Sequence, residues 1–189
     1  AAFGNGLGLA CGDFDGDGVQ EVFVANDMTP NQLWRRGAGS VYRDESLLAG
    51  CAFNGTGFAG SGMGVHAVDV DDDGDLDVFV TQLRRQGHVL YLNKGGWFDD
   101  ETSRFGIFTP SLTHTGFGTG FADFDHDGDL DLFVANGRVT YEEPIPAPAD
   151  PYAEENSLME RTGPTSFALV RPAGGTARAT VTTTAAAIA

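Results

Sequence analysis

The feature that most constrains the fold of this chain is an acidic nine-residue loop that runs directly into an apolar segment. Residues 69–77 read Asp-Val-Asp-Asp-Asp-Gly-Asp-Leu-Asp, and Val-Phe-Val follows. Six carboxylates in this stretch repel one another, and no Lys or Arg stands among them. A hard divalent cation such as Ca²⁺, which takes about six to eight oxygen ligands, would hold such a loop in one shape.

The same loop occurs three times along the chain. Its copies are residues 13–21, 69–77 and 123–131, whose starts are 56 and then 54 positions apart. Each copy runs into an apolar triplet, Val-Phe-Val twice and Leu-Phe-Val once. These β-branched and aromatic residues favour strands. Three copies in one phase, each leading into a strand, argue against a chance cluster of solvated acids.

Alternation along the second loop indicates how it would hold an ion. Asp69, Asp71 and Asp73 can converge on one point while the residues between them face away. A glycine follows at 74 and permits the sharp turn that brings the chain back. The carbonyl of Asp75 can then face the ion, and Asp77 can close the shell with a last carboxylate.

The EF-hand begins with a similar Asp-x-Asp-x-Asp-Gly sequence, but it does not fit this chain. An EF-hand loop needs a glutamate at its twelfth position and a helix on each side. Here the twelfth residue is Val24, Val80 or Val134, and strand-forming residues surround it. The EF-hand interpretation therefore fails on both the ligand and the flanks.

Charge and composition exclude several classes of function. The net charge is −16, and the three loops hold more than half of the 27 acidic residues. The basic residues are scattered and form no stripe, which disfavours nucleic-acid binding. No apolar run approaches the roughly 20 residues that span a bilayer, so no membrane insertion is expected.

The sequence shows no catalytic pattern. His66, His88, His114 and His126 do not follow a zinc-protease spacing, and no serine lies in a Gly-x-Ser-x-Gly turn. We expect His66 and His114 to be packing or solvent-facing residues. The acidic loops are better explained as metal sites than as acid–base pairs, and we predict that the chain is not an enzyme.

Each repeat extends well beyond its acidic loop. A glycine-rich lead-in precedes the loop, at 4–9, 60–65 and 116–121. An alternating apolar and polar segment follows later, at 31–36, 88–93 and 156–161. A glycine-containing turn follows, at 37–40, 94–96 and 162–164, and a short aromatic strand completes the unit, at 41–44, 97–101 and 166–168. About four short strands in roughly 55 residues are typical of a β-propeller blade, so the predicted fold class is all-β.

The predicted organisation is three tandem blades and a tail. Residues 1–173 form blades at about 4–59, 60–115 and 116–173, the last with a Pro-rich insertion at 144–151. Residues 174–189 are rich in Ala and Thr and are expected to be a tail or linker, with one edge strand as the alternative. Closed propellers usually have about 4–8 blades, so three predict a partial propeller, an open array or an assembly of several copies.

Two further features bear on the setting of the chain. It begins at Ala1 without Met or a signal peptide, which we interpret as a mature segment or a fragment. Cys11 and Cys51 are too few for a disulfide scaffold. A single disulfide between them and two buried free thiols are both open, and the sequence favours the thiols.

On the lead-in, the acidic loop, the Asn-x-Leu-aromatic strand and the turn before the last strand, the chain resembles the FG-GAP/VCBS repeat proteins. These include the blades of the integrin α-subunit propeller and bacterial VCBS proteins that often carry an ASPIC/UnbV module. The resemblance covers about residues 4–170 and implies calcium bound between the first two strands of each blade, about three Ca²⁺ ions in all. The ligands it implies are the side chains of Asp13, Asp15, Asp17, Glu21, Asp69, Asp71, Asp73, Asp77, Asp123, Asp125, Asp127 and Asp131, with the carbonyls of Val19, Asp75 and Asp129. Glu21 departs from the family's final Asp, which predicts a weaker first site.

The resemblance and the loops together predict a calcium-binding extracellular module. We expect it at the cell surface or in the periplasm, as an adhesion, interaction or structural scaffold whose partner is a protein or a carbohydrate. Sites with several carboxylates on loops fill at the millimolar calcium of such compartments. Self-association is a further expectation. The alternatives are a subunit of a surface filament, with the tail pairing into a neighbour, and a non-catalytic part of a polysaccharide-degrading or lipid-cleaving enzyme.

Overall fold

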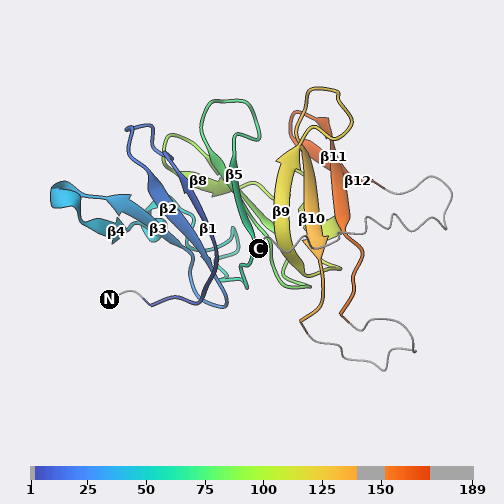
Figure 1. Ribbon diagram of the computed structural model, residues 1–189, viewed down its shortest axis with the longest axis horizontal. Coiled ribbons are helices and arrows are strands. Elements are labelled where there is room, and N and C mark those ends of the chain that lie inside the picture. Colours follow the sequence, from blue (N-terminus) through green and yellow to red (C-terminus); the bar gives the residue numbers. More distant parts are fainter. Residues whose placement is uncertain (1–2, 140–151, 171–189) are drawn as a thin grey trace, which may run out of the picture.

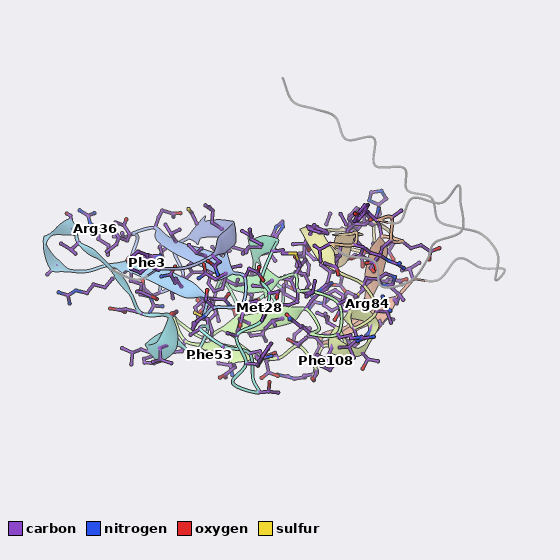
Figure 2. The ribbon with its side chains drawn as sticks, turned by 90° about the horizontal axis from the view of Figure 1, so that it is seen from below. Phe3, Met28, Arg36, Phe53, Arg84 and Phe108 are labelled. Atoms are coloured by element: carbon purple, nitrogen blue, oxygen red, sulfur yellow. The ribbon has the colours of Figure 1, made fainter. Side chains whose placement is uncertain are left out.

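A computed structural model describes residues 3–139 and 152–170 of the chain. These residues form twelve strands in three four-stranded antiparallel sheets, so the fold is all-β as predicted. Each sheet is built from four consecutive strands, and the three stand side by side as successive blades (Figure 1). Seen from below, the row of blades is long and shallow, with Arg36 at one end (Figure 2).

The strands follow the same order in every blade, and we number the blades along the chain. Blade 1 holds β1 (Gly6–Gly12), β2 (Glu21–Asn26), β3 (Gln32–Arg36) and β4 (Tyr42–Asp44). Blade 2 holds β5 (Val65–Val68), β6 (Asp77–Val80), β7 (Val89–Asn93) and β8 (Phe98–Asp100). Blade 3 holds β9 (Gly116–Ala122), β10 (Asp131–Asn136), β11 (Ser157–Gly163) and β12 (Ser166–Leu169). Three short helical segments lie between strands: η1 (Ala38–Ser40), α1 (Ser46–Ala49) and α2 (Phe108–Ser111).

The strand registers align the three repeats residue by residue. In the first two strands of the blades, Leu9 pairs with Val24, Val65 with Val80, and Thr119 with Val134. The segment equivalent to the lead-ins 4–9 and 60–65 is therefore 114–119. The predicted third lead-in, 116–121, was two residues out of register, because glycine alternation continues along β9 and does not mark its start.

An apolar layer fills the space between each pair of neighbouring blades. Side chains alternate across a strand, so one sheet supplies two such layers. Phe23 of β2 packs toward Val78 and Val80 of blade 2, while Phe79, between these two valines, packs toward blade 3. All four residues of β6 are buried for this reason.

The described residues form three blades, as expected of a partial propeller or an open array. The first strands of neighbouring blades, β1 with β5 and β5 with β9, lie against each other. No closed ring forms within residues 3–139 and 152–170. The predicted Pro-rich insertion at 144–151 and the tail at 174–189 lie outside the described residues. Within the described part of the chain, no helix has the length and apolar character needed to cross a membrane.

Both cysteines are free thiols, as the sequence favoured, but only one of them is buried. Cys51 lies in the layer between blades 1 and 2, where burial raises the pKa of its thiol to about 12. Cys11 lies exposed on β1, so the expectation of a buried thiol was wrong for this residue. A thiol with such a raised pKa is protonated at neutral pH, which makes Cys51 a packing residue.

Candidate metal centres

The three acidic loops occupy the same place in the three blades. Each joins the first strand of its sheet to the second, and all three lie along the upper edge of the molecule in Figure 1. The first carboxylate folds each loop back by accepting a hydrogen bond from the glycine amide five residues later. These bonds run from Gly18 to Asp13 at 2.9 Å, from Gly74 to Asp69 at 3.0 Å and from Gly128 to Asp123 at 3.1 Å.

The sixth residue of each loop is a glycine because its backbone lies in the left-handed region. Gly18, Gly74 and Gly128 have φ of +85°, +96° and +99°. Only glycine adopts this conformation without steric cost, which explains why a glycine stands at the predicted turn. The loop is therefore closed by its own backbone and first carboxylate.

The last carboxylate of each loop is buried and ties the loop to the sheet. Glu21, Asp77 and Asp131 accept hydrogen bonds from the amide of the second loop residue, at 2.7, 2.8 and 3.1 Å. The other oxygen of Asp77 accepts from the amide of Asn93 at 2.8 Å, and that of Asp131 accepts from Arg161 at 2.9 Å. These residues end or lie in the third strand, so one carboxylate fixes loop and strand together.

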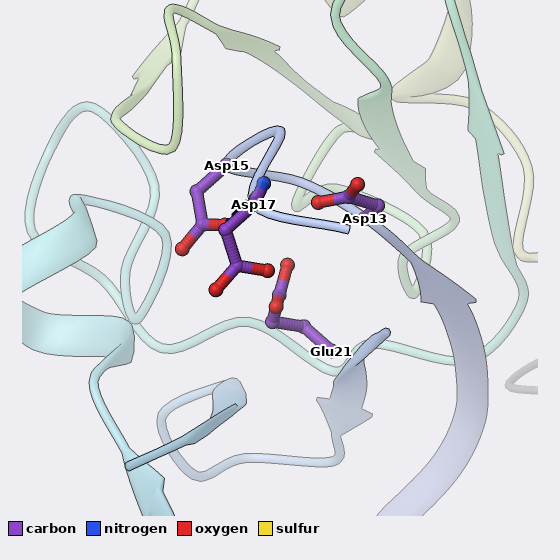
Figure 3. Close-up of side chains that lie close together, drawn as sticks. All are labelled: Asp13, Asp15, Asp17 and Glu21. Carbon is purple, nitrogen blue, oxygen red and sulfur yellow. Dashed lines mark hydrogen bonds between the residues drawn. The ribbon is translucent and has the colours of Figure 1, made fainter. Parts of the chain in front are cut away.

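In the first loop, four predicted ligands come together. Asp13, Asp15, Asp17 and Glu21 each place a carboxylate oxygen within 4.8 Å of the others (Figure 3). The extra methylene of Glu21 does not remove it from the cluster. One of its carboxylate oxygens lies in the cluster. Its Oε2 accepts the hydrogen bond from the amide of Phe14.

The other two loops gather three carboxylates each. The sets are Asp69, Asp71 and Asp77 in blade 2, and Asp123, Asp125 and Asp127 in blade 3. Two predicted ligands stand outside these sets. Asp73 accepts from the amide of Asp75 at 2.9 Å, and both oxygens of Asp131 accept backbone amides. The equivalent cluster members Asp127 and Asp77 make the same bonds, so these bonds do not by themselves exclude a carboxylate from a cluster.

The predicted carbonyl ligands lie in the turn that closes each loop. The amides of Val19, Asp75 and Asp129 donate to the carboxylate two residues before them, at 2.7, 2.9 and 2.9 Å. These bonds fix the orientation of the peptide on the amide side of each residue. The carbonyls themselves stay predicted ligands.

The clusters carry crowded negative charge. Burial, followed by the charges of neighbouring Asp73 and Asp69, raises the pKa of the Asp71 carboxyl. Burial raises the pKa of Glu21 and raises that of Asp77 to about 7. In each case the charged form is the one disfavoured, which is the situation that a bound cation reverses.

Two carboxylate oxygens in these clusters have no hydrogen-bond partner among the described residues. Oδ1 of Asp13 and Oδ1 of Asp71 are buried and unpaired. A buried carboxylate oxygen without a donor is costly, so a ligand at this point is expected. The donors are all oxygen atoms, which suits a hard cation such as Ca²⁺. The residues present therefore fit the ion that the sequence predicted.

Sequence reasoning missed the groups that reach the loops from other parts of the fold. The guanidinium Nε of Arg35 lies 3.5 Å from Oδ2 of Asp15, and its Nη2 donates to the carbonyl of Gly96 in blade 2 at 2.6 Å. The amide of Gly95 donates to Asp75 at 2.7 Å. The Lys-Gly-Gly turn at 94–96 was predicted as a turn only. Its place beside two loops depends on blade packing, which no local pattern encodes.

The four histidines lie apart from the acidic clusters, except that His126 is an exposed member of the third loop. His66 packs edge-on against Phe121, in line with the expected packing role. His88 is buried, and its Nδ1 accepts from the amide of Gln82 at 3.1 Å. The ring of His114 contacts the hydroxyl of the neighbouring threonine.

Comparison with known families gives a match over most of the repeats. Residues 13–80 and 69–134 each match the FG-GAP-like repeat family, so the two matches share the second acidic loop. Together they span well over half of the chain. No curated protein matches the chain.

Proposed function

Because this chain belongs to the FG-GAP-like repeat family, we propose that it is a calcium-binding repeat module that acts outside the cytoplasm. In this proposal the module is a non-catalytic scaffold for binding a protein or a carbohydrate. The observation that carries it is the recurrence of an all-oxygen carboxylate cluster at the same hairpin of three blades. The unpaired oxygens of Asp13 and Asp71 add a direct reason for a cation.

The donor sets favour Ca²⁺ over Mg²⁺. Mg²⁺ demands a near-octahedral shell and keeps several waters, whereas Ca²⁺ accepts irregular shells built from several carboxylates. In the first loop four carboxylates share one point. Each bound ion would bring two positive charges to a cluster that has only acidic side chains of its own, so occupancy would stabilise the loop and the sheet behind it.

An extracellular setting would supply the calcium that such sites need. Ca²⁺ sites of extracellular modules bind with dissociation constants of about 0.1–1 mM, which free calcium outside cells satisfies. The exposed side chains around the loops, such as Asp72, would then be displayed on a fixed scaffold. The carboxylates themselves would be committed to the ion, which supports a binding role over acid–base catalysis.

A calcium titration with a matched pair of variants tests the metal sites. Isothermal titration of the chelator-treated chain should show saturable Ca²⁺ binding. Asp71→Asn should weaken one class of site by about tenfold or more, because it removes a charge from a clustered carboxylate. Asp72→Asn removes the same charge one residue later, from a side chain that is 77% exposed, and should leave all sites nearly unchanged. The absence of any saturable binding, or equal effects of the two variants, would contradict the proposal.

A further inference from the structure

The two interfaces between blades are built in the same way. We call the side of a blade that faces the next blade along the chain its forward face, and the opposite side its backward face. The forward face of blade 1 offers Phe14 and Phe23, and the backward face of blade 2 meets them with Val80, Tyr91 and Phe98. The rings of Phe14 and Phe98 pack edge-on with centroids 5.9 Å apart. Blades 2 and 3 repeat this layer with their equivalent residues.

Among residues 3–139 and 152–170, nothing packs over the same two faces at the ends of the row. By register, Phe124 on the forward face of blade 3 is equivalent to Phe14, yet it is 49% exposed where Phe14 is 1% exposed. On the backward face of blade 1, Leu9 is 65% exposed, and Tyr42, the equivalent of Phe98, is 44% exposed. Each end therefore shows one half of an interface that the molecule already contains twice.

A glycine at each forward face marks where the next blade comes close. A Cβ on Gly8 would lie 2.0 Å from the carbonyl oxygen of Met63, and one on Gly64 would lie 1.8 Å from that of Phe117. No side chain fits at these contacts, so glycine is required. The equivalent position in blade 3 is Gly118, where a Cβ would meet only Ala135 at 3.8 Å among the described residues. Blade 3 keeps the glycine although the described residues provide nothing that needs it.

A polar latch also repeats at the interfaces. Residues at one equivalent position of the third strand reach back and donate a hydrogen bond to a loop carbonyl of the preceding blade. Asn93 Nδ2 donates to the carbonyl of Phe14 at 2.7 Å, and Arg161 Nη1 donates to that of Val70 at 2.6 Å. The equivalent residue of blade 1 is Arg36, which lies at the blade 1 end of the molecule (Figure 2). Among the described residues, its side chain donates a hydrogen bond only to Ser40 of its own turn. Blade 1 thus has the donor of a latch whose acceptor would be the second residue of an acidic loop.

We propose that these two ends bind each other, so that a second copy of this chain docks head to tail. The forward face of blade 3 would pack against the backward face of blade 1 of the second copy. In that arrangement the ring of Phe124 meets Tyr42, Gly118 meets the carbonyl of Leu7, and Arg36 donates to the carbonyl of Phe124. The partner is a second copy of this chain because the two ends are complementary to each other. Their contact would repeat the two interfaces that already join the blades. Two copies make six blades, within the range of about four to eight at which propellers close, so we expect a closed dimer.

Sedimentation analysis of the calcium-loaded chain tests this proposal, which does not depend on the identity of any external partner. The expected species at about 100 µM has twice the 19.9 kDa mass of the chain. Gly118→Ala should weaken the dimer by about tenfold or more, because its methyl group would meet backbone in the joint but only an ordinary contact with Ala135 in the monomer. Gly120→Ala is the matched control, two residues along the same strand face. Blade 1 has Ala10 at this position, so the dimer should be unchanged.

Arg36→Ala tests the opposite end of the joint and should weaken the dimer in the same direction. Arg43→Ala, an exposed arginine on β4 outside the latch, should not. Circular dichroism of every variant would show that the sheets are intact. A monomer at all concentrations would overturn the proposal and leave the two faces to blades of another polypeptide. A dimer that Gly118→Ala and Arg36→Ala leave unchanged, or that both glycine variants weaken equally, would also overturn it.

Discussion

At the residue scale, one position of the repeat holds different side chains that accept the same backbone hydrogen bond. The residue before the third strand is Asn31 in blade 1, His88 in blade 2 and Asn156 in blade 3. Each accepts a hydrogen bond from the amide of the equivalent residue at or just beyond the end of the second strand, at 3.2, 3.1 and 2.9 Å. The asparagine oxygen and the neutral imidazole Nδ1 are equivalent acceptors here, but only the histidine can take up a proton.

This difference predicts a pH dependence of stability that resides in His88. Burial, with a smaller contribution from His114, lowers the pKa of His88 to about 4, below its ordinary value of 6.5. The unfolded chain therefore binds the proton more tightly than the folded chain. The stability that neutral His88 contributes is fully present above pH 6.5 and is lost as pH falls toward 4, by about 2 kcal/mol at pH 5.

The matched variant is His88→Asn, which keeps the acceptor used in the other two blades. Urea unfolding at pH 7 and pH 5 should show that wild type loses about 2 kcal/mol more than the variant between the two pH values. The acidic loops titrate in both proteins, so their effect cancels in the difference. Equal losses in the two proteins would mean that His88 does not control this pH dependence.

The fourth residue of each acidic loop has a left-handed backbone, which costs nothing for glycine but strains a residue with a Cβ. This residue is Gly16, Asp72 or His126, and φ is +72°, +62° and +65°. A left-handed conformation costs a residue with a Cβ about 1–2 kcal/mol, and Asp tolerates it better than His. The strain is therefore greatest at His126.

We predict that His126→Gly stabilises the chain by about 0.5–1 kcal/mol, the relief of strain less the added freedom of the unfolded chain. Asp72→Gly should gain less, because Asp is better tolerated and because its carboxylate lies 3.7 Å from Arg161. Chemical unfolding in the presence of chelator measures both values without a contribution from bound metal. A loss of stability in His126→Gly would show that the imidazole makes a contribution larger than the strain.

At the scale of the element, the local pattern predicted the hairpins and strands but not how they bond across blades. The glycine turns, the apolar triplets and the alternating third strands are short-range signals, and they led to the observed order of strands. The same signals misplaced the third lead-in, because alternating glycines continue along β9 and do not show where the equivalent segment begins. They also gave no sign that Asp73 and Asp131 stand outside the carboxylate clusters, although the residues at the same loop positions, Asp127 and Asp77, belong to them. The latch residues Asn93 and Arg161 could not be recognised from the sequence, because their acceptors are 79 and 91 residues away in the chain.

The latch of blade 3 should be a major support of its interface with blade 2. Arg161 is buried, and it donates to the carbonyls of Val70, Gly163 and Pro164. Arg161→Met keeps much of the aliphatic stem but removes every donor, so we expect a loss of about 2–3 kcal/mol in urea unfolding. Arg104→Met is the control, because its guanidinium is exposed and makes only a 3.7 Å surface ion pair. This control should change stability by less than about 0.5 kcal/mol. Comparable losses in the two variants would show that the hydrogen bonds of Arg161 do not stabilise the interface between blades 2 and 3.

At the scale of the whole molecule, the stability of the row of blades depends on charge that the chain cannot neutralise by itself. The net charge is −16, and its densest part lies in three loops along one edge. Arg35 and Arg161 are the arginines that form ion pairs with loop carboxylates among the described residues. Removal of Ca²⁺ by a chelator should therefore lower the melting temperature markedly, because the repulsion within each loop acts directly on the sheet that the last carboxylate holds.

Salt provides the test that separates charge repulsion from other effects of the chelator. Raising monovalent salt from about 0.1 M to 1 M shortens the Debye length from about 10 Å to about 3 Å, which screens exposed carboxylates. We predict that this salt restores part of the lost melting temperature in the chelator-treated chain and has little effect on the calcium-loaded chain. Addition of Ca²⁺ should restore it fully, because an ion inside the loop also meets the buried oxygens of Asp13 and Asp71 that salt cannot reach. A melting temperature that neither chelator nor salt changes would mean that hydrogen bonds alone hold the loops. The carboxylate clusters would then need a reason other than a structural cation.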